Sequence, residues 1–115
     1  MPSMPDWVTG FPGAVTISDR EHRIVYMNDK SAAGYAKDGG RALIGKKMLS
    51  CHNERSRSIL NNLLESGGQN VYTIDKAGQK KLIFQSAWRD ETGQVAGLVE
   101  VSMVLPPELP HYVRG

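Results

Sequence analysis

Apolar and polar residues alternate in several short segments of this chain, which is the pattern of half-buried strands. Residues 13–18 and 23–27 are two such segments around a polar turn, and they predict a hairpin. Three more segments follow at residues 69–76, 80–89 and 94–105. Tight connections at residues 77–79 and 90–93 separate them, as expected for antiparallel neighbours.

Helical signals lie between the two groups of strands. An apolar stripe of helical spacing begins after residue 53 and consists of Ile59, Leu60, Leu63 and Leu64. Gly67 and Gly68 end this helix. Residues 30–36 allow a short helical segment before the glycines at 39–40. This order predicts an α+β domain, an antiparallel sheet with its helices on one face.

The strands offer two sets of side chains, because successive side chains point to opposite faces of a sheet. The set of larger apolar residues is Val15, Ile17, Tyr72, Ile74, Leu82, Phe84, Trp88 and Leu98. The set of smaller, partly polar residues is Thr16, Val71, Thr73, Ile83, Gln85, Ala87, Val95, Val99 and Val101. Neither set is polar enough to face water, so we expect the helices to cover one face and a second copy or the N-terminal segment to cover the other.

Composition narrows the classes of function. The 115 residues and 12.7 kDa fit one domain. The net charge of +2 is spread along the chain, so we expect no nucleic-acid partner. The apolar runs are too short to cross a bilayer and the N-terminus lacks the pattern of a signal peptide, so we expect a cytoplasmic protein without a membrane partner.

Several motifs, in this order and spacing, resemble the PAS domain family. They are the opening hairpin at 13–19 and 23–28, the Leu-Ile-Gly-Lys step at 43–46, the turn at 89–93 and the strand at 95–99. The resemblance runs from residue 11 to residue 105. Residues 50–57 and 109–114 also resemble short bacterial proteins that consist of a PAS domain alone.

The resemblance implies a PAS fold, with five antiparallel strands in the order 2-1-5-4-3 and with short helices and one longer helix on the concave face. It divides the chain into an N-terminal cap segment (1–12), the PAS domain (13–105) and a proline-rich C-terminal tail (106–115). By this analogy the smaller set lines a pocket, whose expected ligand-binding residues are Thr16, Ile59, Leu63, Val71, Thr73, Ile83, Gln85, Val99 and Val101. The expected dimer or cap interface is Trp7, Val8, Phe11, Val15, Ile17, Tyr72, Ile74, Leu82, Phe84 and Leu98.

The leading hypothesis is a sensory or interaction domain and not an enzyme. A small organic ligand would shift the populations of the sheet and the terminal segments, and a homodimer or a downstream signalling protein would read the change. The sequence does not identify a cofactor. The alternatives are a ligand-free dimerisation module and a small enzyme of another cone-shaped α+β fold, a class that normally begins with a long helix.

Histidine and cysteine side chains are the candidates for cofactor or metal binding. His52 lies just before the helix on which some PAS domains carry a haem-ligating histidine, so a haem-binding sensor that uses His52 is a further alternative. The other interpretation is a loop histidine that bonds backbone at the helix start. Cys51 lacks the motif of flavin-binding relatives and is expected to be a small buried residue. The three histidines show no zinc spacing, and we expect no metal site.

Two further polar features remain. Glu54, Arg55 and Arg57 form a charged turn, which either recognises an anionic ligand or is a solvated helix face. Asn28 ends the second strand, where its amide is expected to bond neighbouring backbone in a structural role.

Overall fold

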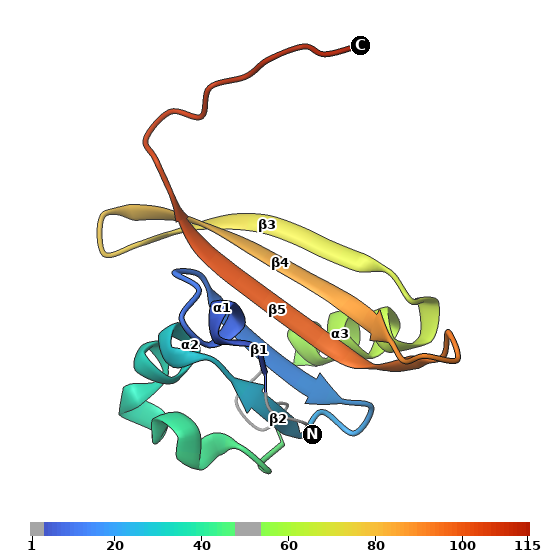
Figure 1. Cartoon of the computed structure of the whole chain (residues 1–115). Coiled ribbons are helices and arrows are strands. Elements are labelled where there is room, and N and C mark those ends of the chain that lie inside the picture. The colour runs from blue at the N-terminus through green and yellow to red at the C-terminus, as the bar shows by residue number, and fades with distance from the viewer. Residues whose placement is uncertain (1–3, 48–53) are drawn as a thin grey trace.

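One five-stranded antiparallel sheet organises the chain in the computed structural model, which describes residues 4–47 and 54–115 (Figure 1). The strands are β1 (Ala14–Asp19), β2 (Ile24–Met27), β3 (Gln69–Lys76), β4 (Gln79–Arg89) and β5 (Val95–Leu105). Their order across the sheet is β2-β1-β5-β4-β3. This confirms the strand order and the α+β class expected from the sequence.

The helical elements are short apart from one. They are α1 (Asp6–Thr9), α2 (Asp29–Gly34), the 3-10 turns η1 (Ala36–Asp38) and η2 (Gly40–Leu43), and α3 (Glu54–Ser66). The chain therefore lacks, over its described residues, the long opening helix of the alternative cone-shaped fold. None of the described helices is long and apolar enough to span a membrane.

Helix α3 packs on one face of the sheet through its leucines. Leu60, Leu63 and Leu64 are buried together with Leu98 of β5, and Ala87 of β4 lies against them. Each buried leucine contributes about 1.5–3 kcal/mol. The helix ends at Gly67, which has a positive φ of 69° and donates its N–H to the Leu63 carbonyl. We call the face that α3 and α2 cover the helix face, and the opposite side the outer face.

Asn28 joins the N-terminal segment, β1 and α2, and this confirms its structural role. Its side chain is fully buried, and its Oδ1 accepts hydrogen bonds from the N–H groups of Val15 (2.9 Å) and Ser31 (3.0 Å). The second bond caps α2. Its Nδ2 donates to the carbonyls of Gly13 (2.9 Å) and Val8 (3.1 Å). One amide therefore satisfies backbone groups of three segments.

The turn between β3 and β4 corrects the expected orientation of β3. It contains two residues, Ala77 and Gly78, with positive φ of 53° and 77°, whereas a three-residue connection was expected. Lys76 therefore pairs with Gln79, and every pair along the hairpin shifts by one residue. A shift of one residue exchanges the two faces of a strand.

The consequence is that four residues of β3 lie opposite to their expected sides. Tyr72 pairs with Ile83, and Ile74 with Lys81, so both lie on the helix face. Val71 pairs with Phe84, and Thr73 with Leu82, so both lie on the outer face.

An irregularity between β4 and β5 corrects the expected orientation of β5. Arg89 pairs with Val95 but Trp88 pairs with Gly97, so Ala96 is an extra residue, as in a β-bulge. The prediction for β5 was wrong beyond this point. Val99 and Val101 pair with Ser86 and Phe84 on the outer face, and Leu98 pairs with Ala87 on the helix face.

The outer face is apolar, and the N-terminal segment covers little of it. Its apolar side chains are Val15, Ile17, Val71, Leu82, Phe84, Trp88, Val99, Val101, Met103 and Leu105. Thr9 of α1 hydrogen-bonds Tyr26 of β2 (3.3 Å), which places α1 at the β1–β2 side. Val8 and Phe11 are half-buried there, whereas Trp7 is 73% exposed. Most of the outer face therefore has no cover from the described part of the chain.

Candidate functional site

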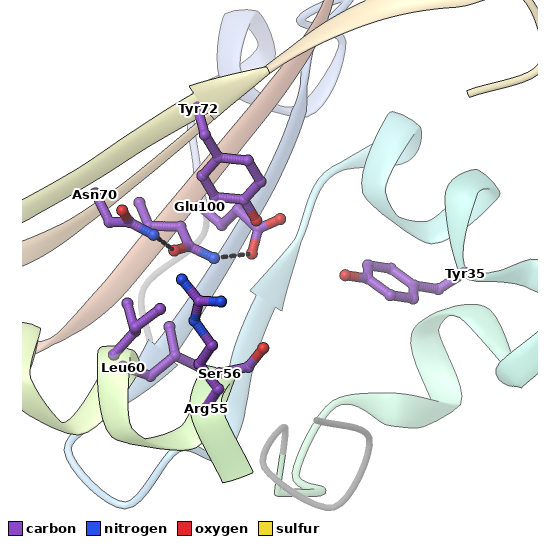
Figure 2. Close-up of a pocket in the computed structure, with 9 residues that line it drawn as sticks. Tyr35, Arg55, Ser56, Leu60, Asn70, Tyr72 and Glu100 are labelled. Carbon is purple, nitrogen blue, oxygen red and sulfur yellow. Dashed lines mark hydrogen bonds between the residues drawn. The ribbon is translucent and has the colours of Figure 1, made fainter. Parts of the chain in front are cut away.

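A cavity of about 450 Å³ lies between the helix face of the sheet and the first turns of α3 (Figure 2). The sheet contributes its floor, α3 one wall, and the residue after α2 the opposite wall. The lining residues are Tyr35, Arg55, Ser56, Ile59, Leu60, Asn70, Tyr72, Gln85 and Glu100. A cavity of this size, partly apolar and with a few convergent polar groups, is typical of a small-molecule site.

A row of three polar side chains crosses the floor of the cavity. Asn70, Gln85 and Glu100 are direct register partners on β3, β4 and β5, so they share the helix face. Asn70 Nδ2 donates to Gln85 Oε1 (2.9 Å), and Gln85 Nε2 donates to Glu100 Oε2 (3.4 Å). Figure 2 shows these bonds as dashed lines. The row holds the Gln85 amide, 7% exposed, in a fixed orientation toward the cavity.

The same row continues toward α2. Thr16 of β1 pairs with Glu100, and its hydroxyl lies 2.6 Å from the hydroxyl of Ser31. Thr16 and Ser31 are both buried. The polar groups that line the cavity are therefore neighbours of the contact that attaches α2 to the sheet.

Tyr72 gives the cavity a hydroxyl that stays protonated. Burial raises the pKa of this phenol, and the nearby carboxylate of Glu100 raises the pKa further. A protonated phenol both donates and accepts hydrogen bonds. The site therefore offers a neutral hydroxyl next to an amide and a carboxylate.

Two walls complete the site. Ile59 and Leu60 provide apolar contact from α3, and Arg55 extends from the same helix toward the polar row (Figure 2). Tyr35, on the other side of the cavity, points its ring toward the space between them (Figure 2). This arrangement can enclose a flat or compact organic molecule and orient it by hydrogen bonds.

The structure brings together only part of the set predicted to line the pocket. Gln85 and Ile59 line the cavity, Thr16 lies beside it, and Leu63 of α3 is buried in the core between this helix and the sheet. Ile83 is buried on the helix face and lines a neighbouring cleft. The other four predicted residues, Val71, Thr73, Val99 and Val101, belong to the outer face by their register.

Sequence reasoning found Gln85 but missed the other polar groups on the sheet side of the site. Asn70, Tyr72 and Glu100 were either unassigned or placed on the other face, because the register of β3 and β5 was shifted by one residue. One signal could have found Tyr72: it lies two residues after Asn70, so the two side chains share a face of β3. The length of the β3–β4 turn then decides that this is the helix face. His52 and Cys51 lie outside the described residues. Among the residues that are described, no three His, Cys, Asp or Glu side chains could together hold a metal ion.

Comparisons with known proteins address the fold. No family model matches the sequence, and no curated protein matches it. The structure is similar to the VqmA dimer of Vibrio cholerae, with a TM-score of 0.70 and 15% identity over 89% of this chain and 51% of VqmA. This chain therefore spans about half the length of VqmA.

Isolated PAS domains are similar over most of their own length. The PAS domain of the histidine kinase ThkA has a TM-score of 0.64 and 17% identity, covering 79% of this chain and 97% of that domain. The Aer2 receptor of Vibrio cholerae, described as a dual PAS-heme oxygen sensor, has a TM-score of 0.62 and 20% identity, covering 82% and 95%. With its strand order, these similarities show that this chain has a PAS-like fold.

Proposed function

We propose that this chain is a sensory PAS domain that binds a small organic ligand in the cavity between the sheet and α3. The observation that carries the proposal is the composition of that cavity, in which a fixed amide, a protonated phenol and a carboxylate face apolar side chains. A similar structure, VqmA, was solved bound to the ligand DPO. We expect a binding domain without enzymatic activity, and the similar structures include the oxygen sensor Aer2.

A relay from the cavity would pass through contacts that already join it to the N-terminal segment. Glu100 of the polar row is opposite Thr16, which contacts Ser31 at the start of α2. Asn28 bonds Ser31 and also the carbonyl of Val8 in the cap. A ligand that binds one arrangement of this network more tightly shifts its population, and a partner protein reads the new position of the cap.

We further propose that the chain consists of a cap segment (1–12), a PAS domain (13–105) and a C-terminal tail (106–115). The cytoplasmic location and the bacterial source stay predictions. Similar structures include a VqmA complex with ligand and DNA. The absence of a nucleic-acid partner for this chain therefore stays a prediction.

Native mass spectrometry tests ligand binding on protein purified from its own source. We expect a bound small molecule that is lost in Gln85→Met, because the variant nearly keeps the side-chain volume but removes the amide at the centre of the polar row, both its carbonyl acceptor and its N–H donors. Gln69→Met is the matched control, because Gln69 is exposed on the outer face. Wild-type protein that is free of ligand under these conditions contradicts the proposal.

A ligand-free dimerisation module is the second candidate, favoured by the uncovered outer face. Phe84 lies near the middle of this face, where it pairs with Val71 and Val101, and it is half-buried. Burying four or five large apolar side chains of this face between two copies would offset much of the cost of association. We expect sedimentation equilibrium to show a homodimer that Phe84→Lys dissociates, and a wild-type monomer at all concentrations would exclude this candidate.

A further inference from the structure

A second cleft continues the cavity beyond Tyr72. Its volume is about 540 Å³, and it lies between α2 and the end of the β3–β4 hairpin. Tyr35, Tyr72 and Glu100 line both spaces, so the two adjoin each other along the helix face. A ligand held at the polar row can therefore extend into the second cleft.

Three lysines from two parts of the fold line this cleft. Lys81 pairs with Ile74, and Lys76 pairs with Gln79, which places both lysines on the helix face at the hairpin end. Lys30 contributes from α2 on the other side. Lys81 is half-buried, whereas Lys30 and Lys76 are exposed.

No acidic partner neutralises these lysines among the described residues. The ion pairs found there join Arg23 to Glu21 and Arg41 to Asp29, so Asp29 is engaged beside Lys30. The acidic side chain that lines the cleft is Glu100, at the end shared with the first cavity. The charged side chains that line the cleft are therefore three lysines and one glutamate, and the lysines lie away from the end that Glu100 occupies.

We propose that this cleft receives the anionic group of a small organic anion whose remainder occupies the first cavity. The inference rests on the proposed function and adds the chemical class of the ligand. The three ammonium groups around the cleft repel each other. An oxyanion bound between them attracts all three, and this attraction offsets the repulsion. The hydroxyl of Ser102, which also lines the cleft, can donate a hydrogen bond to a carboxylate or phosphate oxygen.

The test compares probes of similar size and different charge. Benzoate, phenyl phosphate and benzamide are titrated into ¹⁵N-labelled full-length protein at constant ionic strength, and amide resonances are followed by NMR. We expect both anions to shift resonances of α2 and the β3–β4 hairpin and to bind about tenfold more tightly than benzamide. The two anions distinguish a carboxylate site from a phosphate site.

Adjacent lysines supply a matched pair of variants. Lys81→Gln should weaken benzoate binding about fivefold, the effect of removing one partly exposed charge near an anion, and leave benzamide binding unchanged. Lys81→Arg should retain most of the affinity. Lys80→Gln removes the same charge one residue away, but Lys80 pairs with Leu105 on the outer face, so binding should not change.

Three results would overturn the inference. They are equal affinity for benzamide and benzoate, equal loss in Lys80→Gln and Lys81→Gln, and no shift of the cleft resonances with either anion. The proposed function is decided separately, because native mass spectrometry detects a bound molecule whatever its charge. A neutral molecule retained there would refute the anionic class alone.

Discussion

Asn28→Ala is the most informative single substitution for the stability of this fold. The variant removes hydrogen bonds to Val15, Ser31, Gly13 and Val8, and it leaves two buried N–H groups without their acceptor. A lost buried hydrogen bond costs about 1 kcal/mol, an unsatisfied buried group about 1–3 kcal/mol, and a lost N-cap about 1 kcal/mol. Because these terms overlap, we expect the free energy of unfolding to fall by about 4 kcal/mol.

Urea unfolding measures this loss. A domain of this length has a free energy of unfolding of about 6–17 kcal/mol, so the variant should still fold. With a urea m-value of about 2 kcal/mol per molar, the midpoint falls by about 2 M while the slope stays the same. Asn62→Ala on the exposed surface of α3 is the control, with a change within about 0.5 kcal/mol. A loss below about 1 kcal/mol in Asn28→Ala would refute the structural role assigned to this amide.

Asn28→Asp separates the two halves of the same side chain. The carboxylate still accepts from Val15 and Ser31, but it faces the carbonyls of Gly13 and Val8 without a proton to donate. Burial raises the pKa of such a carboxyl above its unfolded value of about 3.9. The protonated form is therefore favoured in the folded state, and stability should fall as the pH rises through the folded pKa. If Asn28→Asp lost more stability than the wild type as the pH falls toward 4, the assigned orientation of the Asn28 amide would be contradicted.

Four further predictions concern the site, the core and the sheet. In an absorbance titration of the four tyrosines, Tyr72→Phe should remove a phase that ionises above the usual tyrosine range, because partial burial and Glu100 raise the pKa of Tyr72; a titration in which that phase is unchanged contradicts this. For the same reason, wild-type stability should decline above about pH 10 more steeply than that of the variant. Leu63→Ala should lower the free energy of unfolding by about 2–5 kcal/mol in urea, since the leucine is buried under the sheet. Gly97→Ala should lower the melting temperature and shift the fluorescence of Trp88, because a Cβ at Gly97 meets the Ser18 carbonyl that accepts from the Trp88 indole.

Local patterns in the sequence were sufficient for the elements but not for their relative faces. Alternation within a strand shows which residues share a side, so Ile83 and Gln85 were grouped correctly. Which residues of the neighbouring strand lie on the same face depends on the length of the turn that connects the two strands. The two-residue turn at Ala77–Gly78 and the extra residue at Ala96 each shift the pairing register by one residue relative to the prediction. Val71, Thr73, Val99 and Val101 were therefore assigned to the pocket, and Tyr72 to the outer face.

The apolar character of both faces removed the usual check on register. When one face of a sheet is clearly polar, a strand in the wrong register is recognised because it would bury charges. Here β5 carries valines toward one side and Leu98, Glu100 and Ser102 toward the other, so either orientation satisfies the hydrophobic pattern in part. The residues that form the polar row became evident only from the pairing of Asn70, Gln85 and Glu100 across three strands.

Strand β3 lies at the border of the sheet, and this has a consequence for handling the protein. Its backbone has one side without a neighbouring strand, and its Val71 side chain is 49% exposed. Such a border can template intermolecular strand addition, which natural proteins oppose with charged side chains. Charge lies at its hairpin end, in Asp75 and Lys76, and is missing from residues 69–74. Concentrated samples should therefore aggregate first through residues 69–74, and Thr73→Lys should extend their shelf life.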